Sequence, residues 1–216
     1  MFRNRQDAGQ QLAARLVAYK KQNPVVLALP RGGVPVAAEI AAKLDAPLDL
    51  ILVRKIGVPF RLELAMGAVV DGGSPIVVRN EEVIELAGVS EDEFKAACER
   101  ERAEVERRRQ CYLSGRPPIE VAGRAVVVVD DGVATGATMR AALRSAAARK
   151  PSKLVLAVPV APVEAIAALR KEVDEVVCLE PQEHFYAIGP YYDDFRQVSD
   201  DEVRRLLAPH PATATA

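Results

Sequence analysis

The sequence predicts an α/β fold, a doubly wound, mostly parallel sheet flanked by helices. Short runs rich in valine and leucine alternate along the chain with longer segments of helical spacing, which is the pattern of strand–helix–strand units. Half of the 216 residues are apolar, enough for one large core. The strongest predicted strand, Val126–Val129, ends in two acidic residues and a small-residue loop, as strands do at a ligand-binding sheet edge.

The first part of the chain contains two predicted strands, each next to a helix. Apolar residues recur at helical spacing near the amino terminus, and Pro30 and two glycines separate a short strand from an alanine-rich helix. We expect a helix at Asp7–Lys21, a strand at Val25–Leu29, a helix at Val34–Leu44 and a strand at Leu48–Val53.

The stretch Gly57–Gly73 allows two interpretations. Its flanking Gly and Pro residues favour a mobile connection, which a catalytic lid requires. The alternative is a rigid hairpin with Ile76–Val78 as a return strand, because apolar residues in the stretch are spaced as in a strand packed on the core: Leu62, Leu64, Met66 and Val69.

Two helices are expected next, at Glu81–Ala87 and Glu91–Leu113. The second is dense in charge, and opposite charges recur three and four positions apart. We therefore interpret it as a solvated, self-paired helix rather than a nucleic-acid-binding face. Four apolar residues would give it one buried stripe: Phe94, Ala97, Val105 and Tyr112.

The last part of the chain returns to the alternating pattern. We expect a single domain over residues 1–208, with a core at about 24–180, a helical insertion at about 80–116 and a hood at about 181–207. The tail 209–216 is expected to be disordered. The remaining core elements are strands at Ala125–Val129, Leu154–Val158 and Val173–Leu179 and a helix at Val163–Lys171.

Composition limits the classes of partner. Lys and Arg total 29 against 30 Asp and Glu, so a net charge of −1 gives no drive toward nucleic acid or an anionic membrane. No apolar run approaches the roughly 20 residues of a membrane span. The cysteines lack metal-binding spacing, which favours reduced thiols and a cytoplasmic location: Cys98, Cys111 and Cys178. A homodimer is compatible with the sequence.

The segment Val126–Thr138 predicts an anion site. A strand end, a Gly-containing loop and a helix start bring free backbone N–H groups and a positive helix dipole together, and Thr135 and Thr138 add hydroxyls. Asp130 and Asp131 would repel an anion, so they are expected to meet hydroxyls or a divalent cation. A sugar phosphate fits. The alternative is an ordinary turn in which Thr138 is the N-cap, which does not explain two aspartates after a buried strand.

Two other predicted strand ends carry anion-binding chemistry. Arg31, Gly32 and Gly33 follow the first strand, where an arginine fork and close backbone approach suit a phosphate. Arg54 and Lys55 follow the second strand. Each group alone could be an ordinary solvated turn or strand end, but three such ends on one sheet favour a shared site.

Val126–Thr138 resembles the ribose-phosphate signature of the type I phosphoribosyltransferases: four apolar residues, two acids, and a loop with Thr-Gly and a final Thr. Pro30–Gly33 resembles the pyrophosphate-binding loop of that family. Arg54–Gly57 resembles the Arg-Lys-x-Gly of adenine phosphoribosyltransferases, and Ala134 stands where 6-oxopurine enzymes carry an acidic residue. The long insertion and carboxyl-terminal hood depart from the adenine enzymes, so the acceptor base stays open.

The resemblance implies a Mg²⁺-dependent transfer of ribose 5-phosphate from 5-phosphoribosyl 1-pyrophosphate to a nitrogenous base, with release of pyrophosphate. Asp130 and Asp131 would act on the ribose hydroxyls, with Mg²⁺ held mainly by the substrate near them. The 5-phosphate would lie on Gly132, Val133, Ala134, Thr135, Gly136, Ala137 and Thr138. Pyrophosphate would lie on Arg31, Gly32, Gly33, Arg54 and Lys55.

Glu63 corresponds to the mobile catalytic loop of the family and is the candidate for proton transfer. Replacing both Asp130 and Asp131 by Asn is expected to abolish donor binding and leave the fold intact, since both are predicted at the solvent end of the strand. Two alternatives remain. One is a non-catalytic regulator that binds the same phosphosugar. The other is a phosphatase-like hydrolase with Asp130 as nucleophile, although it lacks a second acid two residues later.

Overall fold

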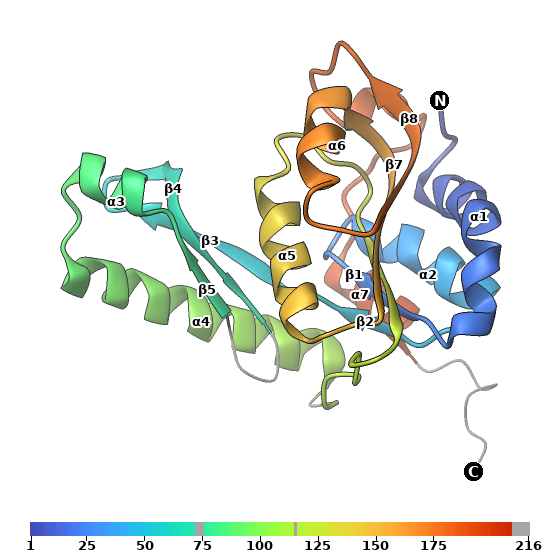
Figure 1. The fold of residues 1–216 in the computed structure, drawn as a ribbon, viewed down its shortest axis with the longest axis horizontal. Helices are drawn as coiled ribbons and strands as arrows, with labels where there is room; N and C mark the ends of the chain where they lie inside the picture. The colour runs from blue at the N-terminus through green and yellow to red at the C-terminus, as the bar shows by residue number, and fades with distance from the viewer. Residues whose placement is uncertain (72–75, 115, 209–216) are drawn as a thin grey trace.

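A computed structural model describes residues 1–71, 76–114 and 116–208, except for the side chains of residues 62 and 63. Within these residues, the core is a parallel sheet of five strands in the order β2-β1-β6-β7-β8 (Figure 1). The predicted fold class is thereby confirmed. The strands are β1 (Val25–Ala28), β2 (Leu48–Leu50), β6 (Ala125–Val129), β7 (Lys153–Pro162) and β8 (Glu175–Gln182).

Helices cover both faces of this sheet (Figure 1). Val127 and Val129 of β6 belong to the cluster that includes α1 and α2, whereas Val126 and Val128 belong to the cluster that includes α5 and α6. A strand buried on both faces cannot alternate apolar with polar residues, which explains the run of valines. The helices are α1 (Arg5–Leu16), followed by the 3-10 helix η1 (Val17–Gln22), α2 (Gly33–Leu44), α5 (Ala137–Ala148) and α6 (Val163–Leu169).

A second, antiparallel sheet forms an arm that extends away from the core (Figure 1). It corrects one expectation. The predicted strand Leu48–Val53 ends at Leu50, because the amide of Leu52 donates to the Asp71 carboxylate (2.7 Å) and diverts the chain into the arm. The arm consists of β3 (Val53–Val58), β4 (Arg61–Val70), β5 (Ile76–Arg79), α3 (Glu81–Ala87) and α4 (Glu91–Leu113).

The stretch Gly57–Gly73 follows the hairpin alternative rather than the expected mobile connection, as far as the chain is described. β3 pairs with β4 in antiparallel register, with irregularities around Gly57. Met66 and Val69 are fully buried, whereas Leu64 is exposed. Residues 72 and 73 lie outside the described residues.

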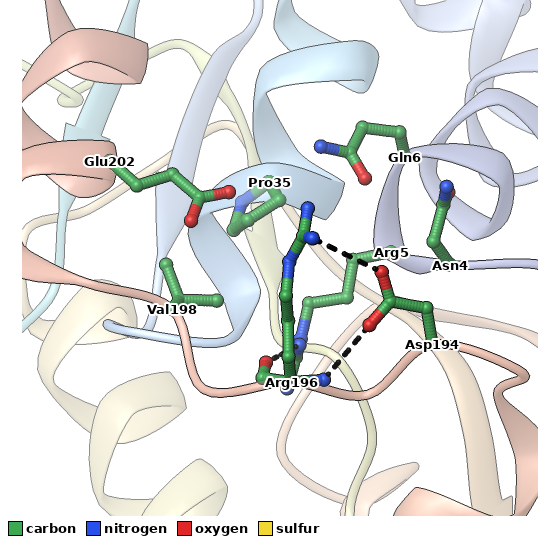
Figure 2. A pocket seen from close by; sticks show the side chains of 8 residues that line it. All are labelled: Asn4, Arg5, Gln6, Pro35, Asp194, Arg196, Val198 and Glu202. Carbon is green, nitrogen blue, oxygen red and sulfur yellow. Dashed lines mark hydrogen bonds and ion pairs between the residues drawn. The ribbon is translucent and has the colours of Figure 1, made fainter.

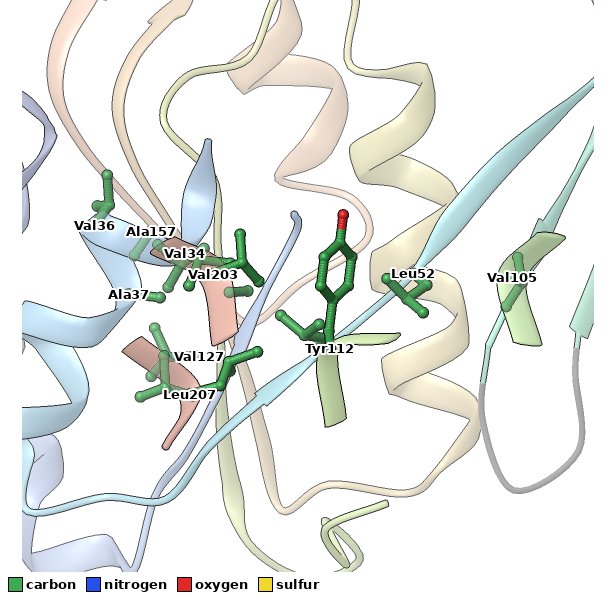
Figure 3. Close-up of a cluster of buried hydrophobic side chains, with 14 of the residues drawn as sticks. Val34, Val36, Ala37, Leu52, Val105, Tyr112, Val127, Ala157, Val203 and Leu207 are labelled. Atoms are coloured by element: carbon green, nitrogen blue, oxygen red, sulfur yellow. The ribbon is translucent and has the colours of Figure 1, made fainter. Parts of the chain in front are cut away.

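The long helix α4 has the predicted bounds, the predicted buried stripe and part of the predicted self-pairing. Glu104 accepts hydrogen bonds from Arg107 and Arg108, one turn away. At the other end, Figure 3 shows Tyr112 in the same buried cluster as Leu52 and Val203. The helix therefore joins the arm to the core along one apolar face.

The amino-terminal residues meet the carboxyl-terminal stretch at residues 191–194. The amide of Phe2 donates to the Tyr191 carbonyl (2.8 Å), and the amide of Asp193 donates to the Phe2 carbonyl (2.9 Å). The carboxyl-terminal stretch contains a 3-10 helix, η2 (Gly189–Tyr191), and α7 (Asp200–Leu207), which packs against α2 and α4. The tail 209–216, expected to be disordered, lies outside the described residues. In the described part of the chain, none of the helices is long and apolar enough to cross a membrane.

A mostly buried arginine anchors the arm to the central sheet. Arg109 of α4 donates to the Asp71 carboxylate (2.7 Å), and its other terminal nitrogen lies 4.0 Å from the Asp49 carboxylate on β2. Burial raises the pKa of Asp71, and the hydrogen bond from Leu52 and the Arg109 charge oppose that rise. Asp49 also accepts hydrogen bonds from the amides of Leu50 and Ile119.

We predict that Arg109→Met lowers the free energy of unfolding by about 3–5 kcal/mol, because it leaves two buried carboxylates without their cation. Urea denaturation measures the change. Arg107→Met is the matched control: it removes an arginine of the same helix whose side chain is 66% exposed and pairs with Glu104. It should leave the free energy of unfolding close to that of the wild type, because an exposed ion pair contributes little. Equal losses for the two variants would contradict the proposed anchor.

Candidate functional site

Two loops meet where the order of strands reverses. β1 and β6 are paired in parallel, and the chain leaves β1 for β2 on one side and β6 for β7 on the other. The amide of Leu29 donates to the Val129 carbonyl (2.9 Å), which extends the pairing beyond the strands. The loop at 30–33 and the segment at 130–138 therefore lie side by side, at the position where open α/β sheets bind ligands.

The glycines of the first loop allow this contact. A Cβ on Gly33 would lie 2.8 Å from the Val129 carbonyl oxygen, and a Cβ on Gly32 would lie 2.0 Å from Oδ2 of Asp131. From the sequence, we expected these glycines to let a phosphate approach the backbone closely. In the structure their lack of a side chain also lets the two loops touch.

Two helices begin at this sheet edge with open amino termini. Gly32 is the N-cap of α2 and Gly136 is the N-cap of α5, and no side chain caps either helix in the described structure. Gly136 has φ +78°, which a residue with a Cβ adopts only with strain. Thr138 lies inside α5, so the alternative of a turn capped by Thr138 is wrong. The helix dipoles make both termini suitable for anions. Among the described residues the first-turn N–H groups of α5 are available to a ligand, whereas at α2 the amides of Gly33 and Val34 donate to the carbonyls of Leu29 and Arg31.

The loop before α5 is held at its base and open at its tip. The amide of Val133 donates to the Val160 carbonyl (3.0 Å), and Ile188 of the carboxyl-terminal stretch packs so closely that a Cβ on Gly132 would lie 2.8 Å from it. Ala134 and Thr135 are exposed. The loop thus presents its tip to solvent on a fixed base.

The two acids are not equivalent. Asp131 is only 8% exposed: its Oδ2 accepts a hydrogen bond from Nε of Arg5 (2.8 Å), and its carbonyl accepts one from the Tyr192 hydroxyl (2.6 Å). Oδ1 of Asp130 accepts the amide of Asp131 (2.8 Å). Burial raises the pKa of Asp130 well above its ordinary value, and the Asp131 carboxylate adds to the rise. Burial also raises the pKa of Asp131, but Arg5 opposes that rise.

A cleft of about 380 Å³ opens beside the acids. It brings together two residues of the predicted pyrophosphate loop, one predicted acid and four residues that the sequence interpretation missed. Its walls are Arg5, Arg31, Gly32, Asp131, Phe195, Gln197 and Val198. A smaller cavity of about 20 Å³ adjoins it on the other side of Arg5, between the start of α1 and the stretch 194–202 (Figure 2).

Arg31 is partly neutralised. Its guanidinium lies 3.4 Å from the Asp200 carboxylate at the start of α7, and that carboxylate also accepts the Tyr112 hydroxyl (2.8 Å). Both members of the Arg31–Asp200 pair are substantially exposed, so the pair is weak. An anionic ligand can therefore compete with Asp200 for Arg31.

Other predicted site residues lie elsewhere. Arg54 and Lys55 were expected to follow a strand of the central sheet. Instead they belong to β3 of the arm. Arg54 donates to Glu101 of α4 (2.8 Å), Lys55 is exposed, and among the described residues neither lines the cleft. The backbone of Glu63 lies in β4, and its side chain falls outside the described structure. Their ligand roles stay predictions.

Most of the missed residues had a weak signal. Phe195 and Gln197, and Tyr192 behind them, fall in the stretch predicted as a hood, whose aromatic content could have suggested contact with a ligand. Arg5 had no signal, because an arginine near the start of an amphipathic helix is ordinarily solvated. Only the contact of the amino-terminal residues with the stretch 191–196 brings it to Asp131.

Comparisons with known proteins identify the family of this chain. The sequence profile of the phosphoribosyl transferase domain matches residues 3–196. Relatives from two strains of Mycobacterium tuberculosis, whose names assign them provisionally as phosphoribosyl transferases, are 46% identical over 207 residues. The alignments cover 96% of this chain and 46% of each relative, so the chain spans about half the length of these relatives.

A solved structure covers nearly the whole chain. The crystal structure of TT1426 from Thermus thermophilus is 42% identical, with a TM-score of 0.82, and the match covers 96% of this chain and 97% of that one. The adenine-type likeness of individual motifs stays a prediction. On the profile match, the sheet order and the loops at its edge, this chain belongs to the phosphoribosyl transferase family and has the type I fold of that family.

Proposed function

We propose that the protein transfers ribose 5-phosphate from 5-phosphoribosyl 1-pyrophosphate to a nitrogenous base and releases pyrophosphate. The observation that supports this most is the start of two uncapped helices, α2 and α5, at the adjacent ends of β1 and β6, with two acids between them. A donor with a phosphate at one end, a pyrophosphate at the other and hydroxyls between them matches this order of groups.

Each part of the donor has a proposed contact. The 5-phosphate lies on Gly132–Thr138, where the amides at the start of α5 and two threonine hydroxyls supply donors. Asp130 accepts the ribose hydroxyls, and its charge favours the positive charge that develops at the anomeric carbon as the bond to pyrophosphate breaks. Arg31–Gly33 holds the departing pyrophosphate. A ring nitrogen of the base then forms the new bond to that carbon, because the site holds donor and base in reacting orientation.

The residues present fit a Mg²⁺ ion that arrives with the donor. Within the described residues no cluster of three or more His, Cys, Asp or Glu side chains could hold a metal alone, and Asp131 is already engaged by Arg5. Mg²⁺ typically uses one or two carboxylates together with substrate phosphates and water. Asp130 is the carboxylate proposed to meet it. When bound, the ion would offset the negative charge of the leaving pyrophosphate.

The first prediction concerns turnover. Incubation with 5-phosphoribosyl 1-pyrophosphate, Mg²⁺ and a panel of purine, pyrimidine and other nitrogenous acceptors should release pyrophosphate with at least one acceptor, measured by a coupled pyrophosphate assay. Each acceptor without donor, and donor without acceptor, serve as controls. Donor binding without pyrophosphate release from any acceptor would instead indicate the non-catalytic phosphosugar binder.

The second prediction separates the two acids. Asp130→Asn should lower pyrophosphate release by about 100-fold or more, and it should change the free energy of unfolding by less than about 1 kcal/mol. Asp131→Asn should cost about 3–5 kcal/mol of unfolding free energy, because Arg5 stays buried without its partner. This corrects the expectation that both replacements leave the fold intact. Urea denaturation and initial rates distinguish the variants; an Asp130→Asn enzyme of normal rate would remove that residue from the mechanism.

The third prediction concerns proton transfer. We propose that Glu63 acts on the base or the leaving group, so Glu63→Gln should lower kcat by about tenfold or more and leave donor affinity within about twofold. Steady-state kinetics and calorimetric donor titration measure the two quantities. Glu85→Gln, on the exposed surface of α3 in the same arm, is the control. Unchanged kcat in the Glu63 variant would direct the search to the carboxyl-terminal stretch.

A further inference from the structure

Arg5 makes three contacts with segments far from it in the sequence. Its Nε donates to the Asp131 carboxylate (2.8 Å), and its Nη1 donates to the Arg196 carbonyl (2.8 Å). Its guanidinium also lies over the ring of Phe195, 3.9 Å from the ring centre. Figure 2 shows the bond to the Arg196 main chain beside the Asp194–Arg196 ion pair. One planar cation thus joins α1, the second acid and the carboxyl-terminal stretch.

Asp131 in turn contacts the neighbouring loop at residues 31–33. Its Oδ2 occupies the space directly beside Gly32, where even a Cβ would not fit. The same oxygen receives the Arg5 hydrogen bond, so Arg5 presses the carboxylate against the loop backbone. Beyond Gly32, the amide of Gly33 donates to the Leu29 carbonyl (3.1 Å), and the amide of Val34 donates to the Arg31 carbonyl (3.2 Å). These two amides mark where the loop becomes α2.

We propose that Arg5 is a positioning residue of this site. By its hydrogen bond it holds Asp131 in contact with Gly32. The loop 31–33 is thereby kept in the conformation that binds the pyrophosphate group. On this proposal the two adjacent acids divide their tasks: Asp131 supports the loop, and Asp130 remains for the ligand. The assignment deepens the proposed function and rests on it for the identity of the ligand.

The geometry of the arginine matters as well as its charge. A guanidinium presents donors in a fixed plane, so it can serve Asp131 and the Arg196 carbonyl together while its face stacks on Phe195. A lysine keeps the charge that neutralises Asp131, but its ammonium is a compact point charge without that planar fork. Arg5→Lys therefore separates neutralisation from positioning.

The test compares two variants of Arg5 with a variant at the opposite end of the same strands. Arg124 donates hydrogen bonds to the carbonyls of Asn23 and Pro24 before β1. Arg124→Met therefore removes an arginine that links two segments, at a place distant from the site. For wild type, Arg5→Met, Arg5→Lys and Arg124→Met, hydrogen exchange of the Gly33 and Val34 amides and calorimetric titration with inorganic pyrophosphate are measured on the full chain.

In both Arg5 variants, we expect exchange at Gly33 and Val34 to rise and pyrophosphate affinity to fall, each by about tenfold or more. Arg124→Met should leave both within about twofold of wild type, even if its thermal stability drops. Arg5→Lys keeps the charge and is the variant expected to fold if Arg5→Met does not. Normal loop protection and affinity in Arg5→Lys, or equal changes in Arg124→Met, would overturn the proposal.

Different results would contradict the transferase assignment and the positioning role of Arg5. If no acceptor yields pyrophosphate from the wild-type protein, the transferase assignment fails, but exchange at Gly33 and Val34 still decides whether Arg5 holds the loop. If turnover is normal and exchange in the Arg5 variants matches wild type, the positioning role fails and the transferase assignment stands.

Discussion

The parallel pairing of β1 with β6 is the contact on which the site depends. Four residue pairs align from Val25–Val126 to Ala28–Val129, and the Leu29 amide continues the pattern. This register sets which part of one loop faces which part of the other, so that Gly32 lies against Asp131 and Gly33 against Val129. Because a one-residue slip exchanges the two faces of a strand, it would also move valines between the two buried clusters. The core packing therefore protects the geometry of the site.

Two arginines, Arg5, which is buried, and Arg109, which is mostly buried, attach peripheral segments to this sheet by the same physical means. Arg109 pairs with Asp71 and joins the arm, whereas Arg5 pairs with Asp131 and joins α1 to the stretch 195–196. In each case a carboxylate taken out of water needs a cation, and that cation comes from a distant segment. The cost of leaving either acid unpaired makes the attachments specific. The arm and the chain ends are placed by charge pairing as well as by apolar burial.

The site combines open anion-binding ends with a constrained acid pair. The positive ends of the α2 and α5 dipoles face this edge and the first N–H groups of α5 are available, while Asp131 is enclosed by Arg5, Gly32 and Tyr192. Adjacent carboxylates repel each other, and Arg5 relieves that repulsion at Asp131 while Asp130 keeps a strongly raised pKa. This asymmetry between neighbouring acids is the electrostatic feature most relevant to ligand binding.

The sequence by itself determined the order of the central strands and helices, whereas it extended the strand from Leu48 past its observed end at Leu50 and left Gly57–Gly73 between two interpretations. The valine run, the helical spacings and the bounds of Glu91–Leu113 follow from periodicity, which is a local property of the chain, and the acids after Val129 marked the functional sheet edge. The tertiary structure alone decided that Arg54 belongs to the arm and that Arg5 meets Asp131, 126 residues away. Such pairings depend on sheet order and on how the amino-terminal residues pack against the stretch 191–196. A charged residue has the same local pattern whether it remains solvated or becomes buried against a distant partner.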